Sequence, residues 1–372
     1  MNKAMNIKKV TITAVISLIA VLISLGGEQL LAAPPEQPPG LEIAEPPGLE
    51  VAMAVQDAHT PSLMANPEVV GTAVGLDENG SPAILVFAKS DQVKGIPSSL
   101  EGFPVKVEVT GEFFALNSLP RASSTSESVT PSASVGSCPF GPDGRCNRPV
   151  PIGVSTGHPV ITAGTIGCRV KKDIDGDGIQ EVFALSNNHV YAHENMASIG
   201  DNVLQPGTFD GGLNPADAIG TLYDFKPIDF SGNCTNTIDA AIAHSSTDLL
   251  SNSTPPNGYG IPKSATARPR LNQRLDKYGR TSGSSNGGCL TYALNATINI
   301  GYESGVACFK KQIIVLSYTN ECGLPGDSGS LFVTLRKKPV GLLFAADAIG
   351  LTVIANPIRD VLNYFGVTID GE

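Results

Sequence analysis

The sequence has no excess of positive charge and no paired CxxC motifs. Its 25 lysines and arginines stand against 35 aspartates and glutamates, which gives a formal charge of −10 over 372 residues and a pI near 5.0. This balance argues against a general nucleic-acid binder, because such proteins need a basic surface. Without CxxC pairs, the seven cysteines do not match a zinc site.

The sequence also lacks a run of the roughly 20 apolar residues that a membrane-spanning helix needs. The one candidate, Val10 to Leu25, is shorter, uncharged and preceded by lysines at positions 3, 8 and 9. This pattern is typical of an export signal, so residues 1–33 are predicted to be a signal peptide, with an uncleaved anchor as the alternative. No cysteine directly follows the run, which argues against a lipid anchor. We therefore expect a secreted or extracytoplasmic protein.

Three further segments precede the β-rich part of the chain. Residues 34–50 are dense in proline and repeat the unit PPGLE, which predicts an extended spacer. Residues 51–118 predict a small α/β unit with a short helix limited by Pro61, a hairpin turning at Asp77–Gly80 and a third strand. This unit is either a prosegment that assists folding or blocks a cleft, or an accessory domain. The Ser/Pro-rich residues 119–147 predict a flexible linker and a natural cleavage site.

Residues 148–372 have the texture of an all-β domain. Short β-prone runs alternate with clusters of Gly, Asn, Asp and Ser, which indicates a sandwich or a barrel. One helix-like segment, PIRDVLNYFGV, closes the chain. About 220 residues suit a pair of small barrels that share one cleft.

A serine flanked by glycines lies in the run Gly326-Asp327-Ser328-Gly329-Ser330. Such a serine can sit on a tight turn with backbone N–H groups beside it, which is the arrangement that acyl transfer needs. A serine hydroxyl also requires a base and a group that orients the base. His189, in ALSNNHVYA, ends an apolar run, and Asp239 lies in NTIDAAIAHS. Asp229 is the alternative acid, although a turn role suits it better.

These strings resemble the bacterial trypsin-like serine peptidases of the chymotrypsin fold, from about residue 149 to the end. The order His189, Asp239, Ser328 is the one that this family uses. ALSNNHV is similar to the histidine motif of HtrA-like members, and DAAIA to the family's aspartate motif. CGLPGDSGS and KYGRTSGSSNGG are similar to segments of the streptogrisin branch. The resemblance implies a double β-barrel with a C-terminal helix, polypeptide substrates and no required cofactor.

The resemblance also implies a role for each residue. His189 takes the Ser328 proton, Asp239 orients the ring, and the N–H groups of Gly326 and Ser328 form the oxyanion hole. Arg280, in KYGRTSG, is expected to pair with the buried Asp327 and hold the site in shape; the alternative is a solvated surface arginine. The implied activity is a serine endopeptidase that works through an acyl-enzyme. A catalytically idle binding protein of the same fold is the alternative, and the residue order disfavours an esterase-like hydrolase.

Two features of the sequence bear on which substrate residue is preferred before the scissile bond. The position six residues before Ser328, where trypsins place an aspartate, is Cys322, so a preference for Arg or Lys is not supported. We expect the pocket wall around Phe344-Ala345-Ala346-Asp347, because this stretch follows the nucleophile strand. Asp347 is a candidate charge in that pocket.

Two groups of residues predict extra stabilisation. Asp173, Asp175, Asp177 and Glu181 have a spacing that can wrap oxygen ligands around Ca²⁺, although Ala184 at the twelfth position excludes an EF-hand. The alternative is a polar hairpin turn. Among the cysteines, Cys138 with Cys146 is the most plausible disulfide, and Cys289 with Cys308 is a candidate pair across a hairpin. Because the number of cysteines is odd, at least one remains unpaired or bonds elsewhere.

Overall fold

The computed structural model describes residues 44–116, 137–318 and 322–372. The predicted signal peptide, most of the proline-rich spacer and most of the predicted linker lie outside these residues. Within the described ranges, no helix combines the length and the apolar character that crossing a membrane requires.

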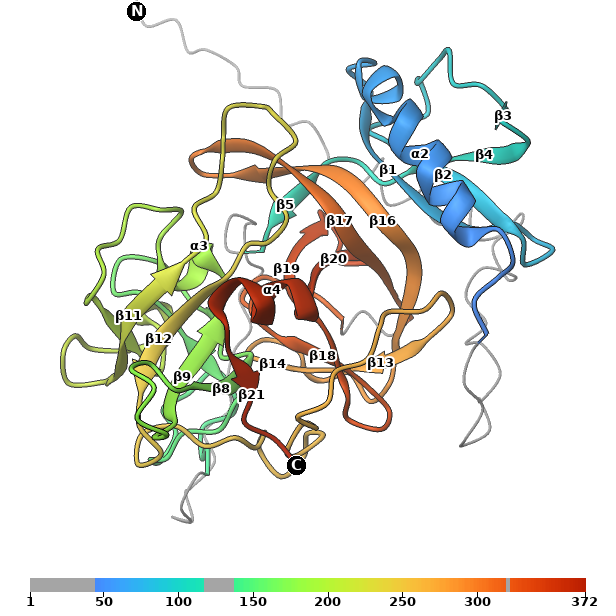
Figure 1. Ribbon diagram of the computed structural model, residues 1–372. Coiled ribbons are helices and arrows are strands. Elements are labelled where there is room, and N and C mark those ends of the chain that lie inside the picture. The colour runs from blue at the N-terminus through green and yellow to red at the C-terminus, as the bar shows by residue number, and fades with distance from the viewer. Residues whose placement is uncertain (1–43, 117–136, 319–321) are drawn as a thin grey trace, which may run out of the picture. The chain divides into compact units, whose positions relative to one another are not determined.

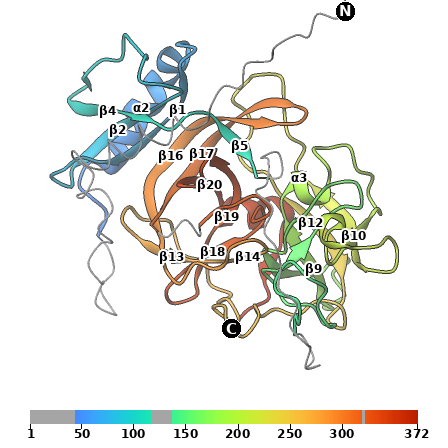
Figure 2. The same cartoon turned by 180° about the vertical axis from the view of Figure 1, so that it is seen from behind.

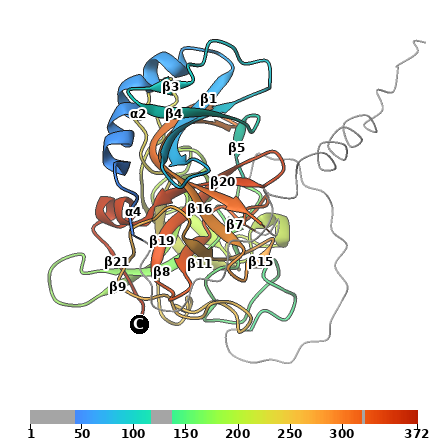
Figure 3. The same cartoon turned by 90° about the vertical axis from the view of Figure 1, so that its right-hand side faces the viewer.

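Residues 49–109 form a helix packed against a small sheet (Figures 1 and 3). The predicted hairpin is confirmed: its two strands pair antiparallel, and the third strand adds in parallel to the second. Pro61 does not end the helix, which continues to Met64, so Pro61 limits it less than expected. The elements are α2 (Leu49–Met64), β1 (Val69–Leu76), β2 (Pro82–Ala88), β3 (Ser99–Leu100) and β4 (Phe103–Val109).

This small sheet continues into the β-rich part of the chain through one pair of strands. β1 pairs antiparallel with β16 (Cys289–Tyr302), a long strand that forms a hairpin with β17 (Gly305–Ser317) (Figure 1). Gly71 permits the close approach, because a Cβ there would lie 2.8 Å from the carbonyl oxygen of Thr297. The backbones of β1 and β16 therefore share one hydrogen-bonded ladder.

A closed barrel of six strands forms the C-terminal core. Its strands follow the order β13, β18, β19, β20, β17, β16, and a further pairing of β13 with β16 closes the ring. Apolar side chains from all six strands, such as Leu275, Phe332 and Val353, fill it. Besides β16 and β17, the ring consists of β13 (Arg274–Asp276), β18 (Leu331–Thr334), β19 (Pro339–Asp347) and β20 (Thr352–Pro357).

A second six-stranded sheet, in the order β10, β11, β12, β9, β8, β21, surrounds another apolar cluster that includes Val170, Phe183 and Ile242. The predicted terminal helix is α4 (Ile358–Phe365), whose buried residues join this cluster. The mainly β double-barrel fold with a C-terminal helix is thus confirmed. The strands are β8 (Cys168–Lys172), β9 (Glu181–Ser186), β10 (Asn202–Leu204), β11 (Ala218–Phe225), β12 (Ala241–Ser245) and β21 (Thr368–Ile369).

Short elements complete the described chain and lie mainly in the loops around the barrels. They are β5 (Phe113–Ala115), β6 (Ser155–Thr156), β7 (Gly164–Thr165), β14 (Tyr278–Gly279), β15 (Gly283–Ser284), α3 (Asn188–Tyr191) and the 3-10 turn η2 (Thr208–Asp210).

Three disulfides crosslink the described chain: Cys138–Cys146, Cys234–Cys308 and Cys289–Cys322. The first was predicted, but the expected Cys289–Cys308 pair is wrong. In the β16–β17 ladder Cys289 lies opposite Ser317, whereas Cys308 lies opposite Asn299. Ten strand residues, or roughly 33 Å, therefore separate the two cysteines. Cys168 is the one free cysteine of the described residues, and it is buried.

Candidate active site

His189 stands just after the end of a buried strand. β9 runs into the core, and the chain then turns into the short helix α3, which carries the histidine in its first turn. The ring nitrogen Nδ1 lies 2.5 Å from Oδ2 of Asp239, and both side chains are fully buried. The backbone N–H of His189 also donates to Oδ1 of Asp239 at 3.3 Å. Asp239 therefore orients both the imidazole and the chain that carries it.

Asp239 itself is held by three other residues, one of which is Asn187, whose side-chain N–H donates to the Asp239 carbonyl oxygen at 2.8 Å. Asn356 exchanges two hydrogen bonds with its backbone, each 3.0 Å long. The Tyr302 hydroxyl, near the end of β16, donates to Oδ2 of Asp239 at 2.9 Å. Burial and the neighbouring carboxylate raise the pKa of Tyr302 well above its ordinary value, so the phenol stays protonated and donates. Sequence reasoning missed Tyr302, because nothing in its local string marks a contact 63 residues away.

The rival acid, Asp229, has the turn role that the sequence suggested. Its carboxylate accepts the N–H of Ser231 at 2.8 Å and the hydroxyl of Thr235 at 2.6 Å, both within its own loop. The structure thus places Asp239, and not Asp229, beside the histidine.

Ser328 lies on a tight turn that depends on two glycines. Gly326 and Gly329 have φ values of +96° and +94°, and a Cβ at Gly329 would lie 2.2 Å from the carbonyl oxygen of Thr165. Thr165 holds this turn through two hydrogen bonds. Its N–H donates to Ser328 O at 2.7 Å, and its hydroxyl donates to Gly326 O at 2.8 Å. The hydroxyl of Ser186, the last residue of β9, donates to Thr165 O at 2.8 Å. The turn that carries Ser328 therefore meets β9 three residues before His189.

The hydrogen bond between His189 and Ser328 is not formed in this structure. The Ser328 hydroxyl donates to the carbonyl oxygen of Phe344 at 3.3 Å instead. Nε2 of His189 is buried and has no hydrogen-bond partner within the described chain. In the neutral tautomer whose Nδ1–H donates to Asp239, Nε2 is an acceptor, which is the state that a general base requires. Catalytic hydrogen bonds often tighten only when substrate is bound.

The backbone N–H groups of the turn divide into two sets. Those of Asp327, Gly329 and Ser330 all donate to carbonyl oxygens at 2.8–2.9 Å. Those of Gly326 and Ser328 donate to no acceptor among residues 44–116, 137–318 and 322–372. The two N–H groups expected to form the oxyanion hole are thus the two that the turn leaves unpaired.

The ion pair that supports the turn differs from the prediction. Asp327 pairs with Lys277, whose Nζ lies 3.2 Å from Oδ2, and both side chains are fully buried. Arg280 instead pairs with Asp210, its Nε lying 2.7 Å from Oδ2, and its guanidinium stacks over the ring of Phe209. The predicted Arg280–Asp327 pair is therefore wrong. The alternative of a solvated Arg280 is also wrong, because the residue is only 2% exposed.

Asp327 is an ionised carboxylate enclosed by donors. Besides Lys277, it accepts the N–H groups of Thr281 at 2.9 Å, Ser282 at 3.2 Å and Leu324 at 3.0 Å, and the hydroxyl of Ser282 at 2.7 Å. Burial alone raises the pKa of this carboxyl, but the lysine charge and the hydrogen bonds outweigh it and lower the pKa below its ordinary value. The carboxylate consequently connects the turn that carries Ser328 to the segment after β14.

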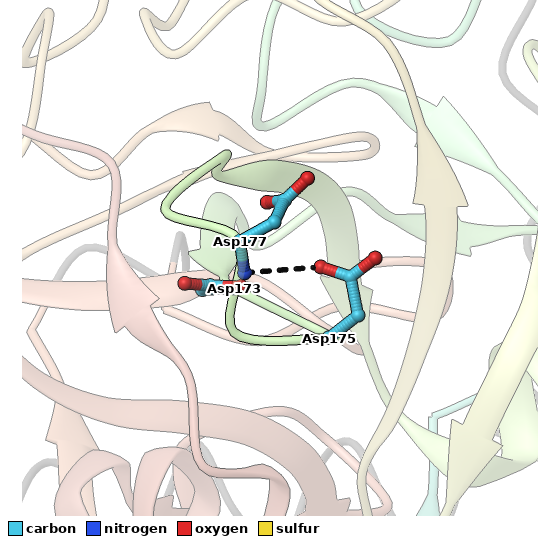
Figure 4. A group of neighbouring side chains, drawn as sticks. All are labelled: Asp173, Asp175 and Asp177. Carbon is cyan, nitrogen blue, oxygen red and sulfur yellow. Dashed lines mark hydrogen bonds between the residues drawn. The ribbon is translucent and has the colours of Figure 1, made fainter.

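The candidate calcium loop brings its three aspartates together (Figure 4). One carboxylate oxygen from each of Asp173, Asp175 and Asp177 lies within 4.8 Å of the others. The same carboxylates accept backbone N–H groups of their own loop at 2.7–3.3 Å. Glu181 accepts the N–H of Ile174 at 3.2 Å. This geometry is compatible with both the ion site and the polar turn.

Comparisons with known proteins give distant similarities. No protein-family model matches the chain, and no curated protein matches it. Among solved structures, it is similar to a glutamic acid-specific serine protease (16% identity, TM-score 0.42), to Thermobifida fusca protease A (15%, 0.40) and to Cellulomonas bogoriensis chymotrypsin (14%, 0.37). The matches cover 59–60% of this chain and 98–100% of those chains. Similarity at this distance assigns neither an activity nor a substrate.

Proposed function

We propose that this chain is a secreted serine endopeptidase that hydrolyses peptide bonds through Ser328, His189 and Asp239. The observation that carries the proposal is the buried His189–Asp239 contact of 2.5 Å, with Nε2 of His189 left without a hydrogen-bond partner among the described residues. The unpaired N–H groups of Gly326 and Ser328 add a place for a developing oxyanion. Three disulfides fit an extracytoplasmic location.

Each step follows from these positions. Ser328 attacks the scissile carbonyl while Nε2 of His189 takes the hydroxyl proton. Asp239 stabilises the imidazolium that results, and the two N–H groups stabilise the negative charge on the carbonyl oxygen. His189 then passes the proton to the leaving amine. Water repeats the sequence on the acyl-enzyme and restores Ser328.

A fluorophosphonate probe tests the proposal. We expect it to label the wild-type chain and the Ser264→Ala control, which changes an exposed serine, and not to label Ser328→Ala. Because His189 and Ser328 are buried, labelling is followed over hours so that transient opening suffices. Labelling that persists in Ser328→Ala, or no labelling of the wild type, would favour the alternative of a catalytically idle binding protein.

A further inference from the structure

A strand from the N-terminal region lies against β19, the second strand after Ser328. β5 pairs antiparallel with the end of β19, with Ala115 opposite Ala345 and Phe113 opposite Asp347 (Figure 2). On its other edge β5 pairs with β16. The pairing with β19 extends one residue further, because the N–H of Leu116 donates to the carbonyl oxygen of Phe344 at 3.3 Å.

That carbonyl oxygen also accepts the Ser328 hydroxyl, again at 3.3 Å. The Leu116 nitrogen and the Ser328 oxygen are therefore no farther apart than twice 3.3 Å. The carbonyl carbon of Leu116 is two covalent bonds beyond its nitrogen. Strand pairing thus places Leu116 beside the residue whose carbonyl oxygen accepts the Ser328 hydroxyl. In this binding mode backbone hydrogen bonds position a peptide and alternate side chains read its sequence.

From this register we propose that β5 and Leu116 occupy the site as a substrate strand, and that the enzyme cleaves after leucine and similar apolar residues, first of all after its own Leu116. The inference deepens the proposed function and rests on it. It assigns the substrate class through the residue whose side chain enters the pocket.

The surroundings of Leu116 are apolar. Its side chain is fully buried and belongs to the hydrophobic cluster that includes Cys322, Leu343, Ala346 and Val353. The disulfide Cys289–Cys322 occupies the position where an aspartate would select Arg or Lys. A lysine or glutamate in this place would bury an unpaired charge, which is strongly unfavourable.

Asp347, the candidate charge of the pocket, forms its hydrogen bonds within its own loop. Its carboxylate accepts the N–H groups of Ile349 at 3.2 Å, Leu351 at 3.0 Å and Thr352 at 3.0 Å. These bonds turn the carboxylate toward its own loop. The pocket consequently keeps its apolar character up to the end of β19.

The self-cleavage step is an ordinary hydrolysis. Ser328 attacks the carbonyl carbon of Leu116, the C–N bond to Asn117 breaks, and the amine leaves with the proton that His189 carries. Water then cleaves the ester, which leaves a carboxylate on Leu116 and returns the proton to Ser328. In the structure no hydrogen bond joins the Leu116 carbonyl to the N–H of Gly326 or Ser328, so the strand is aligned before the oxyanion hole is engaged.

The first test maps the amino termini of the purified full chain by mass spectrometry. We expect a new terminus beginning Asn117-Ser118-Leu119 in the wild type and none in Ser328→Ala. Leu116→Met should still be cut there, whereas Leu116→Lys should be cut at least about tenfold more slowly. Leu335→Lys, which makes the same change at a leucine that is 57% exposed, should be cut like the wild type.

The second test does not depend on how the Leu116 variants fold. Wild-type protein is given the fluorogenic peptides Phe-Phe-Ala-X with X as Leu, Met, Lys or Glu, and the same samples are labelled with the fluorophosphonate. Hydrolysis at least about tenfold faster for Leu and Met than for Lys and Glu supports the inference. Probe labelling with equal rates, or with a preference for a charged residue, overturns the inference and leaves the proposed function intact. If the wild type shows no probe labelling and no hydrolysis, both the inference and the proposed function are overturned.

Discussion

The buried pair of Lys277 and Asp327 makes a quantitative prediction. Lys277→Met keeps most of the side-chain volume but leaves the Asp327 carboxylate without its cation. Removing one partner of a buried ion pair typically costs about 3–5 kcal/mol of the free energy of unfolding. Four hydrogen bonds to the carboxylate remain, so we expect a loss near the lower end, about 3 kcal/mol.

Urea denaturation measures this loss. All variants carry Ser328→Ala, so that proteolysis does not contribute, and the disulfides stay oxidised. The urea midpoint should fall while the slope of the free energy against urea stays constant. Lys338→Met, the same change at an exposed lysine, should alter the free energy of unfolding by less than about 0.5 kcal/mol.

The loss of unfolding free energy in Lys277→Met should also depend on pH. In the wild type the folded pKa of Asp327 lies below its ordinary value of 3.8, so this group stabilises the fold above that value and the contribution is lost as the pH falls through the folded pKa. Without Lys277 burial dominates and raises the pKa, so the carboxyl is neutralised earlier. The difference between wild type and Lys277→Met should therefore be largest near pH 7 and shrink toward pH 4. A pH-independent deficit, or one below about 0.5 kcal/mol, would refute the reasoning.

Three further predictions concern other parts of the chain. Tyr302→Phe removes one donor to Asp239 and should lower kcat/KM about tenfold without unfolding the protein, because hydrogen bonds to charged groups contribute about 1.5–3 kcal/mol. The control Tyr292→Phe, which removes a similar bond to Glu108, should leave kcat/KM within twofold. Equal losses in the two variants would contradict a role of Tyr302 in holding Asp239. Millimolar Ca²⁺ should raise the Tm and EDTA reverse it if Asp173, Asp175 and Asp177 hold an ion, and Asp175→Asn should abolish the response; a Tm constant within about a degree leaves only the polar turn. Burial raises the pKa of the Cys168 thiol, so a thiol reagent should find no reactive cysteine in the native chain and one after denaturation.

The parts of the site that lie in short local strings could be predicted from the sequence. A glycine-flanked serine, a histidine after an apolar run and an acid before small buried residues each mark a turn or strand end, and the structure brings His189 and Asp239 into contact. The ion pair could not be predicted in this way. Lys277 and Arg280 are three residues apart and flank the two-residue strand β14, so the same short string offers two cations. The sequence does not show which of the two meets Asp327.

The second feature that could not be predicted from the sequence is the pairing register of strands that lie far apart in the chain. The hairpin of β16 and β17 was expected, but the disulfide depends on which residues face each other along its whole length. Tyr302 and Leu116 reach the site through the same register, because β16 and β5 carry them there. Such contacts depend on the pairing of strands far apart in the sequence, and the local composition of those strands is that of ordinary β structure.

The ladder between β1 and β16 has a consequence for the solubility of a shortened chain. β16 pairs with β17 on one edge, and on the other with β13 near its start, β1 in its middle and β5 near its end. Loss of the residues up to Leu116 would leave the middle of this strand with unpaired N–H and C=O groups, which is a template for another chain. A chain without its N-terminal sheet would therefore associate edge to edge at high concentration, even with its active site open and intact.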